Sequence, residues 1–449
     1  MAKKTKELSL EEKLEQALVP VEEQPYEVPG NWCWCHISDI ADVVTGSTPS
    51  KKKEEYYGGE FPFFKPADLD AGDKVYEATE YLSDEGKAVS RIIPELSTAV
   101  CCIGSIGKSG LLLREGTTNQ QINSIITKLN AYYMYYYTKT EYFVSQLWSK
   151  STSTTISMVN KSNMKTVYFP LAPEEEQKRI VEAIESLFAK LDEAKEIAEE
   201  IVFNSDERKK AIYKKAFDGS LTNRWREENR IDISSWERIP FEKLGKLERG
   251  RSKHRPRNDE RLFGGVYPFI QTGDVAGAGM YVTSHKQTLS EFGFEQSRMF
   301  PKGTLCITIA ANIGDAAILS YDCCFPDSVV GFTPGEKCLN KYMYFYLQEI
   351  KAELEYIAPA TAQKNLNLKL LGAVEIKVPS LKEQEKIVEV LEKQINYQDS
   401  IVEKAEGVID SIDIMKKSIL AKAFRGELGT NIESEESSIE LLKQILEVS

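Results

Sequence analysis

The hexapeptide Glu176-Gln177-Lys178-Arg179-Ile180-Val181 returns 207 positions later as Glu383-Gln384-Glu385-Lys386-Ile387-Val388, and this repetition decides how the chain is organised. Six further pairs of segments keep nearly the same offset. They are Trp32 with Trp236, Gly46 with Gly250, Gly58–Phe63 with Gly264–Phe269, Ile106-Gly107 with Ile313-Gly314, Tyr133–Tyr137 with Tyr342–Tyr346, and Lys215–Leu221 with Lys422–Leu428. The offset stays between 204 and 209, and chance does not hold a register across seven separated segments. Two copies of this length predict two domain pairs rather than a solenoid.

A heptad pattern of apolar residues begins inside each copy of the hexapeptide. In the first copy, alternating spacings of four and three residues join Ile180, Ile184, Leu187, Leu191, Ala194, Ala198 and Ile201. In the second copy, the pattern runs through Ile387, Leu391, Gln394, Gln398, Ile401, Ala405, Val408, Ile412, Met415 and Ile419. Each pattern predicts a helix of about 40 residues, which is about 60 Å long at 1.5 Å per residue. Pro173 and Pro379 stand where these helices can begin, and Gly219 and Gly426 where they can end.

The two heptad seams most simply bury one another. One seam cannot bury itself, so two seams separated by a globular domain predict an antiparallel coiled coil with one domain at each end. Gln394 and Gln398 interrupt the second seam, and a polar core position can fix the register of a coiled coil. The alternative is that each helix packs on its own domain as an ordinary amphipathic helix.

The part of each copy that precedes its helix is rich in β-branched and aromatic residues and is punctuated by Gly, Pro, Asn and Asp. This composition predicts short strands and turns with a few helices, such as 132–147 and 341–357. The expected fold class is α+β, with two mixed α/β recognition domains and a pseudo-twofold internal repeat. The expected segments are 1–30 (acidic), 31–173 (first domain), 174–235 (first helix and linker), 236–382 (second domain), 383–426 (second helix) and 427–449 (acidic tail).

Composition narrows the class of protein. The 449 residues carry a net charge of −12, with acid-rich ends and a basic stretch, 249–261, that reads RGRSKHRPRNDER. Net charge therefore says little about a local basic face, and the acidic ends could dock on a basic partner. None of the eight cysteines forms a Cys-x-x-Cys pair, which favours buried thiols over a zinc site and predicts no bound metal. No apolar run approaches the roughly 20 residues of a membrane span, and no signal peptide is apparent, so we expect a cytoplasmic protein with no membrane partner.

The order of motifs resembles that of type I restriction–modification specificity subunits over nearly the whole chain. The motifs that carry the resemblance are Val43–Ser50, Pro62–Lys65, Gly104–Lys108, Asn119–Asn123, Pro173–Val181 leading into the heptads, and Ala216–Thr222. Each motif is weak alone, but their order, repeated twice with a helix between, is specific. In the second copy Gly250-Arg251-Ser252-Lys253 replaces the Gly-Ser-Thr-Pro-Ser turn, as two copies reading different half-sites would allow.

The resemblance implies a function for each part. Each globular domain would read one half of a split site in double-stranded DNA, and the helices would act as the spacer between the half-sites. Two adenine-specific methyltransferase subunits would dock on the chain, and nuclease subunits would join for cleavage. The chain itself would bind no cofactor, because S-adenosylmethionine would be held by the methyltransferase subunits.

Two pairs of loops carry side chains suited to DNA. Phosphate contacts need cations and hydroxyls, and arginine can bind guanine through two hydrogen bonds. The first pair comprises Thr48, Ser50, Lys51, Lys52 and Lys53 in one copy and Arg251, Lys253, His254, Arg255 and Arg257 in the other. The second pair comprises Thr152, Ser153 and Thr154 in one copy and Gln363, Lys364 and Asn365 in the other. Solvated surface lysines and plain polar loops are the alternative interpretations.

Four other classes of protein fit less well. Glu375-Ile376-Lys377 resembles the Glu-x-Lys of metal-dependent nucleases, completed by Asp327, but it fits an alternating strand equally well. Gly104–Lys108 lacks the Walker spacing of a phosphate loop, so a tight turn between strands is favoured. A methyltransferase would need an Asn/Asp-Pro-Pro-Tyr tetrad for a flipped base, and the chain has none. A coiled-coil scaffold that binds only proteins would not need paired basic loops. The sequence therefore predicts a non-catalytic DNA reader.

Overall fold

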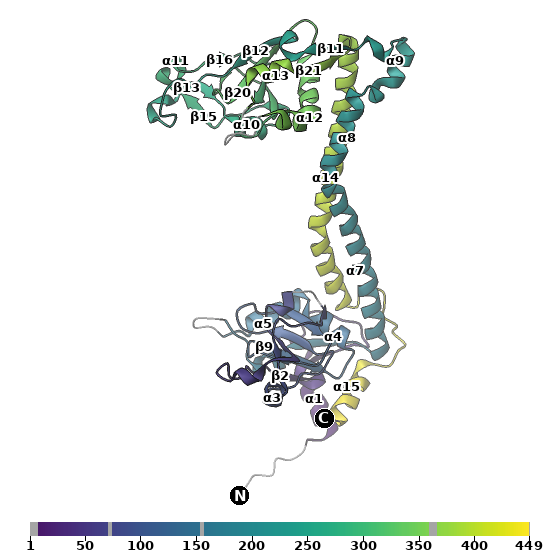
Figure 1. Ribbon diagram of the computed structural model, residues 1–449. Coiled ribbons are helices and arrows are strands. Elements are labelled where there is room, and N and C mark those ends of the chain that lie inside the picture. Colours follow the sequence, from purple (N-terminus) through teal and green to yellow (C-terminus); the bar gives the residue numbers. More distant parts are fainter. Residues whose placement is uncertain (1–7, 71–73, 153–156, 359–365, 449) are drawn as a thin grey trace. The chain divides into compact units, whose positions relative to one another are not determined.

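The computed structural model describes residues 8–70, 74–152, 157–358 and 366–448. The chain divides into two compact units: unit 1 consists of Met1–Ala198 with Gly407–Ser449, and unit 2 of Glu199–Glu406. Unit 1 is therefore built from two segments far apart in the sequence, one from each half of the chain (Figure 1). Over the described residues, no helix is long and apolar enough to cross a bilayer.

The described residues of unit 1 form three sheets. The largest has the order β2 (Ala41–Thr45), β9 (Ile122–Thr127), β6 (Thr98–Cys101), β7 (Ser109–Leu112), β4 (Lys74–Val75). A second has the order β5 (Tyr81–Leu82), β3 (Tyr57–Phe64), β8 (Thr117–Thr118), and β1 (Cys33–His36) pairs with β10 (Tyr168–Leu171). The shorter helices are α1 (Leu10–Ala17), α2 (Ile37–Ile40), α3 (Asp84–Ala88), α4 (Ala131–Thr138), α5 (Glu141–Ser149), α6 (Lys161–Lys165) and α15 (Ser438–Glu447). The helix expected over 132–147 is thus two helices, α4 and α5, since Thr140 begins a new helix by accepting a hydrogen bond from the amide of Phe143.

Unit 2 has the same plan in its main sheet. The order is β12 (Gly245–Arg249), β20 (Val329–Pro334), β17 (Leu305–Thr308), β18 (Ala316–Leu319), β14 (Tyr281–Val282). In both sheets the first four strands are antiparallel and the last pair is parallel. Beside it lie β15 (Gln287–Leu289), β13 (Phe263–Phe269), β19 (Cys323–Cys324) and β16 (Met299–Phe300), and β11 (Glu237–Pro240) pairs with β21 (Glu375–Val378). The helices are α8 (Ser205–Phe217), α9 (Asn223–Asn229), α10 (Thr272–Ala276), α11 (Glu291–Glu295), α12 (Asn340–Ile357) and α13 (Leu368–Ala373).

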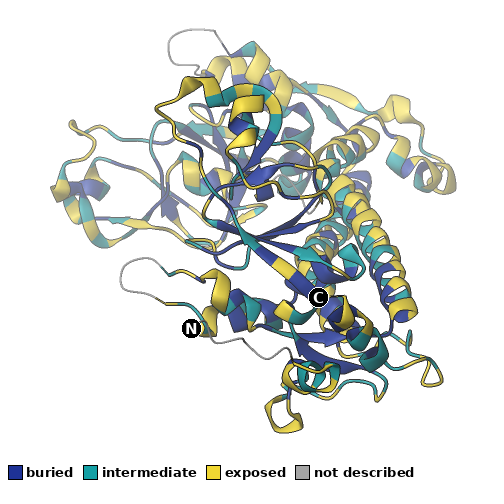
Figure 2. Cartoon of the chain, turned by 90° about the horizontal axis from the view of Figure 1, so that it is seen from below, coloured by how far each residue is buried: buried dark blue, intermediate teal, exposed yellow. Residues whose placement is uncertain are grey.

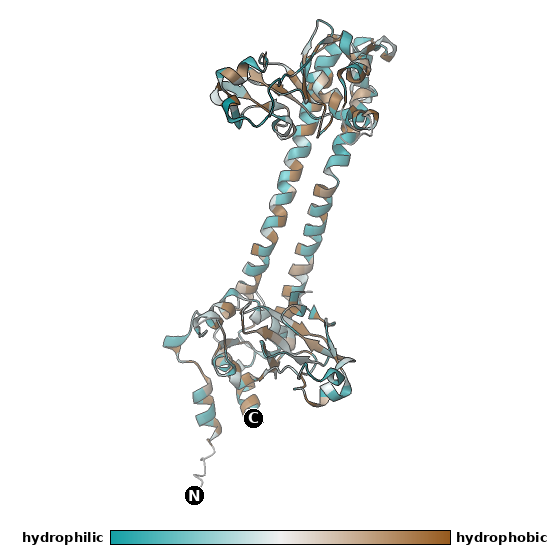
Figure 3. Ribbon diagram, turned by 60° about the vertical axis from the view of Figure 1, so that its left-hand side comes forward, coloured by the Kyte–Doolittle hydropathy of each residue, from teal (hydrophilic) through white to brown (hydrophobic). Residues whose placement is uncertain are grey.

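Two long helices extend from the domains. α7 (Glu174–Phe203) starts directly after Pro173, and α14 (Leu381–Ala423) starts two residues after Pro379, as the sequence indicates. The first heptad region is not one helix, however, because Asn204 separates α7 from α8. The Asn204 side-chain amide donates to the carbonyl of Glu200 at 3.0 Å, which is the competition with the helical backbone that asparagine offers. Figure 3 shows hydrophobic and hydrophilic residues alternating along both helices.

The buried face of α14 differs from the expected seam. Val408 is 42% exposed and Gln394 is exposed, whereas their neighbours Ile409 and Ile395 are partly buried. A straight α-helix has 3.6 residues per turn and drifts by about 20° per heptad from a 3.5-residue repeat, so a strict heptad leaves the buried face. Gln394 therefore cannot act as a polar core position. The other expected seam residues of both helices are buried or partly buried except Met415, which is 48% exposed.

Each unit has an aromatic core that receives a phenylalanine from the end of a long helix. In unit 2, Phe217 lies edge-on to Tyr342 and Tyr346, with ring centroids 5.5 and 4.9 Å away. In unit 1, Phe424 lies 4.9 and 5.2 Å from Tyr133 and Tyr137. Figure 2 shows buried segments of the chain surrounded by exposed ones. The Lys-Ala-Phe repeat of the sequence thus has a packing role, and it attaches the C-terminal part of the chain to the first domain.

Candidate nucleic-acid interface

A helix junction of the same design supports the domain in each unit. Glu176 and Glu383, each the third residue of its helix, have side chains that are fully buried. Glu176 accepts hydrogen bonds from the Trp32 indole at 2.7 Å and from the Asn431 amide at 2.8 Å. Glu383 accepts from the Trp236 indole at 3.0 Å. The repeated Trp and Glu of the sequence therefore form one contact that fixes where each long helix leaves its domain.

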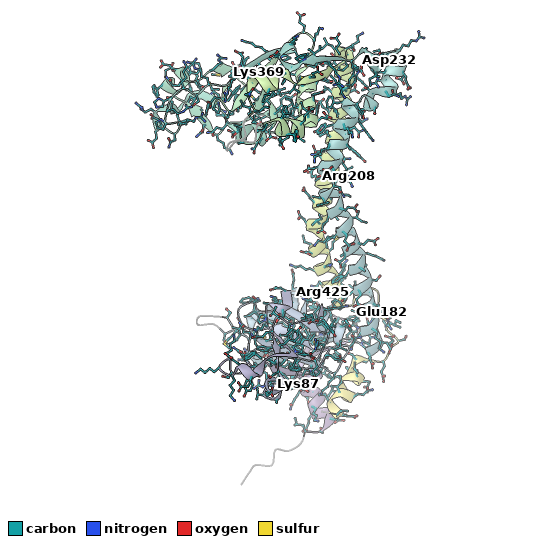
Figure 4. All side chains as sticks on the ribbon, in the orientation of Figure 1. Lys87, Glu182, Arg208, Asp232, Lys369 and Arg425 are labelled. Atoms are coloured by element: carbon teal, nitrogen blue, oxygen red, sulfur yellow. The ribbon has the colours of Figure 1, made fainter. Side chains whose placement is uncertain are left out.

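The segment that follows the helix end completes each junction. In unit 2, Arg226 pairs with Glu383 at 2.9 Å and is itself only 5% exposed. Among the described residues of unit 1, no arginine forms an ion pair with Glu176; Arg179 instead makes two hydrogen bonds, of 2.8 and 2.7 Å, to Glu435 of the C-terminal segment. The Arg425 guanidinium, labelled in Figure 4, lies 5.2 Å from the Tyr26 ring centroid. The acid-rich C-terminal residues thus pack on unit 1, where α15 lies against α1.

The first pair of predicted DNA loops is held against a turn in both units. In unit 1 the amides of Gly46 and Ser47 donate to the carbonyls of Ile122 and Thr118, at 3.0 and 2.8 Å. In unit 2 the amides of Gly250 and Arg251 donate to Val329 and Phe325, at 2.9 and 3.1 Å. The loop that follows β2 or β12 therefore lies directly beside the turn that precedes β9 or β20.

The repeated glycines are required by this close approach. A Cβ atom at Gly46 would lie 2.2 Å from the carbonyl oxygen of Asn119, and one at Gly250 would lie 2.2 Å from that of Pro326. Backbone oxygens cannot move away as a flexible side chain would, so a larger residue would push the loop off the turn. The Gly46 and Gly250 match in the sequence is explained by this packing.

In unit 1 the predicted loop presents mostly unpartnered side chains. Thr48, Ser50, Lys51, Lys52 and Lys53 are all exposed. Thr48 donates a hydrogen bond to the side chain of Gln120, and Lys53 donates to the Tyr56 hydroxyl at 2.9 Å, an interaction that raises the pKa of Lys53. Within the described part of the chain, Lys51 and Lys52 form no ion pair. This loop is a cationic surface available to phosphate.

In unit 2 the predicted loop is more highly ordered. Arg257 donates to both carboxylate oxygens of Asp327, at 2.8 and 2.9 Å, and Arg255 lies 4.0 Å from the same group. His254 contacts Asp259 at 2.8 Å, and hydrogen bonds from Arg261 are the main cause that holds the pKa of Asp259 below its ordinary value.

The two remaining cations of this loop differ from one another. Lys253 is exposed, whereas the Nε atom of Arg251 is buried and has no hydrogen-bond partner among the described residues. Arg251 lines a cavity of about 230 Å³ together with Arg257, Asn258, Gln271, Ser297 and Phe269. The five cations predicted for this loop are thus not equivalent: some are already engaged within the loop.

The second pair of predicted loops is only partly described. Thr152 is exposed and exchanges two backbone hydrogen bonds with Met158, of 3.0 and 3.1 Å. Ser153, Thr154, Gln363, Lys364 and Asn365 lie outside the described residues. For this pair the structure adds only the position of Thr152, after helix α5.

Gln120 and Asp327 take part in the candidate interface although the sequence pattern did not single them out as DNA contacts. Gln120 lies 72 residues from Thr48 and Asp327 lies 70 residues from Arg257, and the pairing of β2 with β9, and of β12 with β20, brings them together. For Gln120 the sequence signal was the motif Asn119–Asn123, quoted for the family resemblance but given no role, and Asp327 was considered only as part of a nuclease motif.

The segments considered for catalysis have structural roles. β21 alternates between exposed and buried residues, and Lys377 donates to the backbone carbonyl of Phe217 at 3.0 Å. Gly104–Lys108 forms the turn between β6 and β7, with positive φ angles at Gly104 and Gly107. All eight cysteines are buried free thiols, and burial raises the pKa of Cys102 to about 12. The expectations of an alternating strand, a tight turn and buried thiols are confirmed.

Unit 2 also has a cleft of about 800 Å³ between α8, α12 and α14. Its aromatic lining includes Tyr213, Tyr344 and Phe345, and its charged lining includes Lys209, Lys351 and Glu392. In unit 1, Glu185 stands 207 positions before Glu392 and pairs with Lys74 at 2.9 Å, and Lys74 lies 4.9 Å from the Tyr132 ring centroid. The two units therefore offer different surfaces beside their long helices.

Comparisons with known proteins agree with this duplicated architecture. The family described as the type I restriction modification DNA specificity domain matches residues 29–202 and again 234–410. The specificity subunit of the type I restriction enzyme EcoBI from Escherichia coli is 24% identical over 437 residues, 90% of this chain and 84% of that protein. The MjaIX specificity subunit from Methanocaldococcus jannaschii is 32% identical over 182 residues, but this match spans only 39% of the chain and 42% of that relative.

A solved structure shows the same fold. The crystal structure of the HsdS subunit from Thermoanaerobacter tengcongensis superposes with a TM-score of 0.68 at 19% identity, covering 91% of this chain and 100% of that chain. Because the family match covers both copies of the repeat, the chain belongs to the family of type I restriction–modification specificity subunits and carries two DNA specificity domains.

Proposed function

We propose that the chain is the non-catalytic subunit that selects the DNA sequence for a type I restriction–modification complex, and that each domain reads one half of a bipartite site. The observation that carries this proposal is the loop and turn that recur in both units with different side chains. The shared backbone suits a shared mode of docking on DNA. The different side chains suit two different half-sites, because base edges are distinguished by the donors and acceptors they meet.

The long helices would set the spacing between the half-sites. In unit 1, Lys416 of α14 pairs with Asp192 of α7 at 2.6 Å; in unit 2, Lys209 of α8 pairs with Asp399 of α14, also at 2.6 Å. The two ion pairs are the same pair in the two copies, since both residues differ by 207 positions. Each unit thus contains an antiparallel pair of helix segments in the same register, which supports one continuous antiparallel coiled coil.

Two methyltransferase subunits would dock on the chain, bring S-adenosylmethionine, and methylate adenine at the selected site; nuclease subunits would join the complex for cleavage. The cleft beside α12 and α14 in unit 2 supports docking there, because aromatic side chains within a charged rim are typical of protein-binding surfaces. The competing proposal, a scaffold that binds only proteins, requires no DNA contact.

The test is reconstitution of the chain with a methyltransferase subunit, followed by selection of bound DNA from a random library and native mass spectrometry. We expect a two-part sequence with an unread gap, and two methyltransferase subunits per chain. The chain alone should transfer no methyl group from labelled S-adenosylmethionine. A complex that binds no DNA would favour the scaffold, and methyl transfer by the chain alone would contradict a non-catalytic role.

A further inference from the structure

We propose that one turn position, occupied by Gln120 in unit 1 and Asp327 in unit 2, determines the base specificity of each domain. Gln120 reads a base edge directly, whereas Asp327 is a positioning residue that orients Arg257. This inference rests on the proposed function and identifies which side chains carry it.

The two positions are structurally equivalent. The amide of Ile122 donates to the carbonyl of Asn119 at 3.1 Å, and that of Val329 donates to Pro326 at 3.0 Å, so each closes a four-residue turn. Gln120 and Asp327 are the second residues of these turns. In both units the reading loop is bound to the residues on either side of the turn, as described for Gly46 and Gly250. The same backbone therefore presents an amide in one domain and a carboxylate in the other.

Gln120 has the chemistry of direct readout. Its neighbour Asn119 is buried, while the Gln120 side chain is exposed. Its Oε1 atom accepts a hydrogen bond from the Thr48 hydroxyl, and in the described chain its Nε2 atom has no partner. An amide oxygen has two lone pairs, so Oε1 can accept a second hydrogen bond while Nε2 donates. A glutamine oriented in this way can bind the N6 and N7 edge of adenine.

Asp327 has the chemistry of a positioning residue. A carboxylate is repelled by the DNA phosphates, so its place in a cationic reading loop needs a compensating role. Both of its contacts with Arg257 are made to the Nη2 atom, at 2.8 and 2.9 Å. The Nη1 and Nε atoms of Arg257 have no partner within the described residues. The backbone carbonyl of Asp327 also accepts from Arg249, so this turn is tied to the end of β12 as well.

The Arg257 guanidinium is therefore held in one orientation, and its Nη1 and Nε atoms can still donate hydrogen bonds. Arginine loses little freedom on binding when its planar group is already oriented, and its free donors match the O6 and N7 atoms of guanine. Asp327 could instead accept directly from the cytosine amino group. If Asp327 positions Arg257, the base preference depends on Arg257; if Asp327 contacts cytosine directly, it does not.

The experiment uses the complete complex with its methyltransferase subunits and selects bound DNA from libraries randomised in each half-site. For Gln120→Ala we expect discrimination at one base position to fall roughly 5- to 150-fold, corresponding to the 1–3 kcal/mol of a bidentate contact. The other half-site should be selected as before, which also shows that the variant complex is folded. Gln16→Ala, an exposed glutamine on α1, is the matched control and should change nothing.

Asp327 is tested with Arg257 in a double-mutant cycle. Asp327→Ala and Arg257→Ala should each relax the same position of the second half-site, and the double variant should lose no more than Arg257→Ala alone. Unaltered base preferences in Gln120→Ala would overturn the role of Gln120. A preference that survives Arg257→Ala but not Asp327→Ala would overturn the positioning role and indicate direct readout. If the wild-type complex selects no two-part sequence, the proposed function itself fails, and this inference fails with it.

Discussion

Removing the Arg226 side chain should destabilise unit 2 strongly, because it leaves the buried carboxylate of Glu383 without its cation. Arg226 lies 2.9 Å from Glu383 and also donates to the carbonyl of Gly219 at 2.6 Å. Both charged side chains are almost fully buried, at 5% and 0% exposure. Breaking a buried ion pair by removing one partner costs about 3–5 kcal/mol, whereas exposed pairs contribute about 0–1 kcal/mol.

The expected size of the effect follows from the hydrogen bonds that remain. In Arg226→Leu, the described residues leave the Glu383 side chain with only the Trp236 indole and the Thr222 hydroxyl, at 3.0 and 3.2 Å. At about 2–4 °C per kcal/mol for a unit of this size, the loss corresponds to roughly 6–20 °C in the melting temperature of unit 2. Arg224→Leu is the matched control, since Arg224 pairs with Glu228 at 3.0 Å on the exposed face of the same helix, α9.

Hydrogen exchange measured by mass spectrometry, with thermal unfolding of the full chain, assigns the effect to a unit. Exchange should increase in unit 2 around 219–240 and 381–390 and stay unchanged in unit 1. The double variant Arg226→Leu with Glu383→Gln should be more stable than Arg226→Leu alone, because the uncompensated charge is gone. A loss below about 1 kcal/mol in Arg226→Leu would refute the reasoning, since a pair of that strength behaves as an exposed one.

Three further predictions concern the spacer, the phosphate contacts and the thiols. Deleting 193–199 together with 409–415 shortens each helix by seven residues and preserves the register of the Asp192–Lys416 pair. At 1.5 Å per residue and 3.4 Å per base pair, the selected gap between the half-sites should shrink by about three base pairs. If the original gap is still selected, the helices do not measure the site. Replacing the lysines of 51–53 by alanine should weaken binding about equally for all DNA sequences. The slope of log binding constant against log salt concentration, measured by titration, should fall by about one per lost phosphate contact. Altered base preference would argue against phosphate contacts. Burial raises the pKa of the thiols, to about 11 for Cys33 and Cys324, so native protein at pH 8 should resist alkylation until it is denatured. Rapid labelling of the native chain would contradict the burial of the thiols.

The sequence alone determined the features that depend on local periodicity and backbone chemistry. The heptads predicted long helices, and proline before Glu174 and two residues before Leu381 marked their starts. Glycine after the helices marked their ends, where Gly219 and Gly426 adopt positive φ angles that other residues disfavour. These features need only neighbouring residues to form, so a pattern of a few residues is enough to reveal them.

Only the tertiary structure decided which distant residues meet. The heptad rule placed Val408 in the seam, but the true period of the helix turns Ile409 toward the buried face instead. The sequence predicts an acidic tail that could dock on a basic partner, whereas the contacts of Asn431 with Glu176 and of Glu435 with Arg179 attach it to the first domain. Gln120 joins Thr48 across 72 residues because antiparallel pairing of β2 with β9 sets their register. Such contacts depend on packing and strand register over the whole domain, which no local pattern encodes.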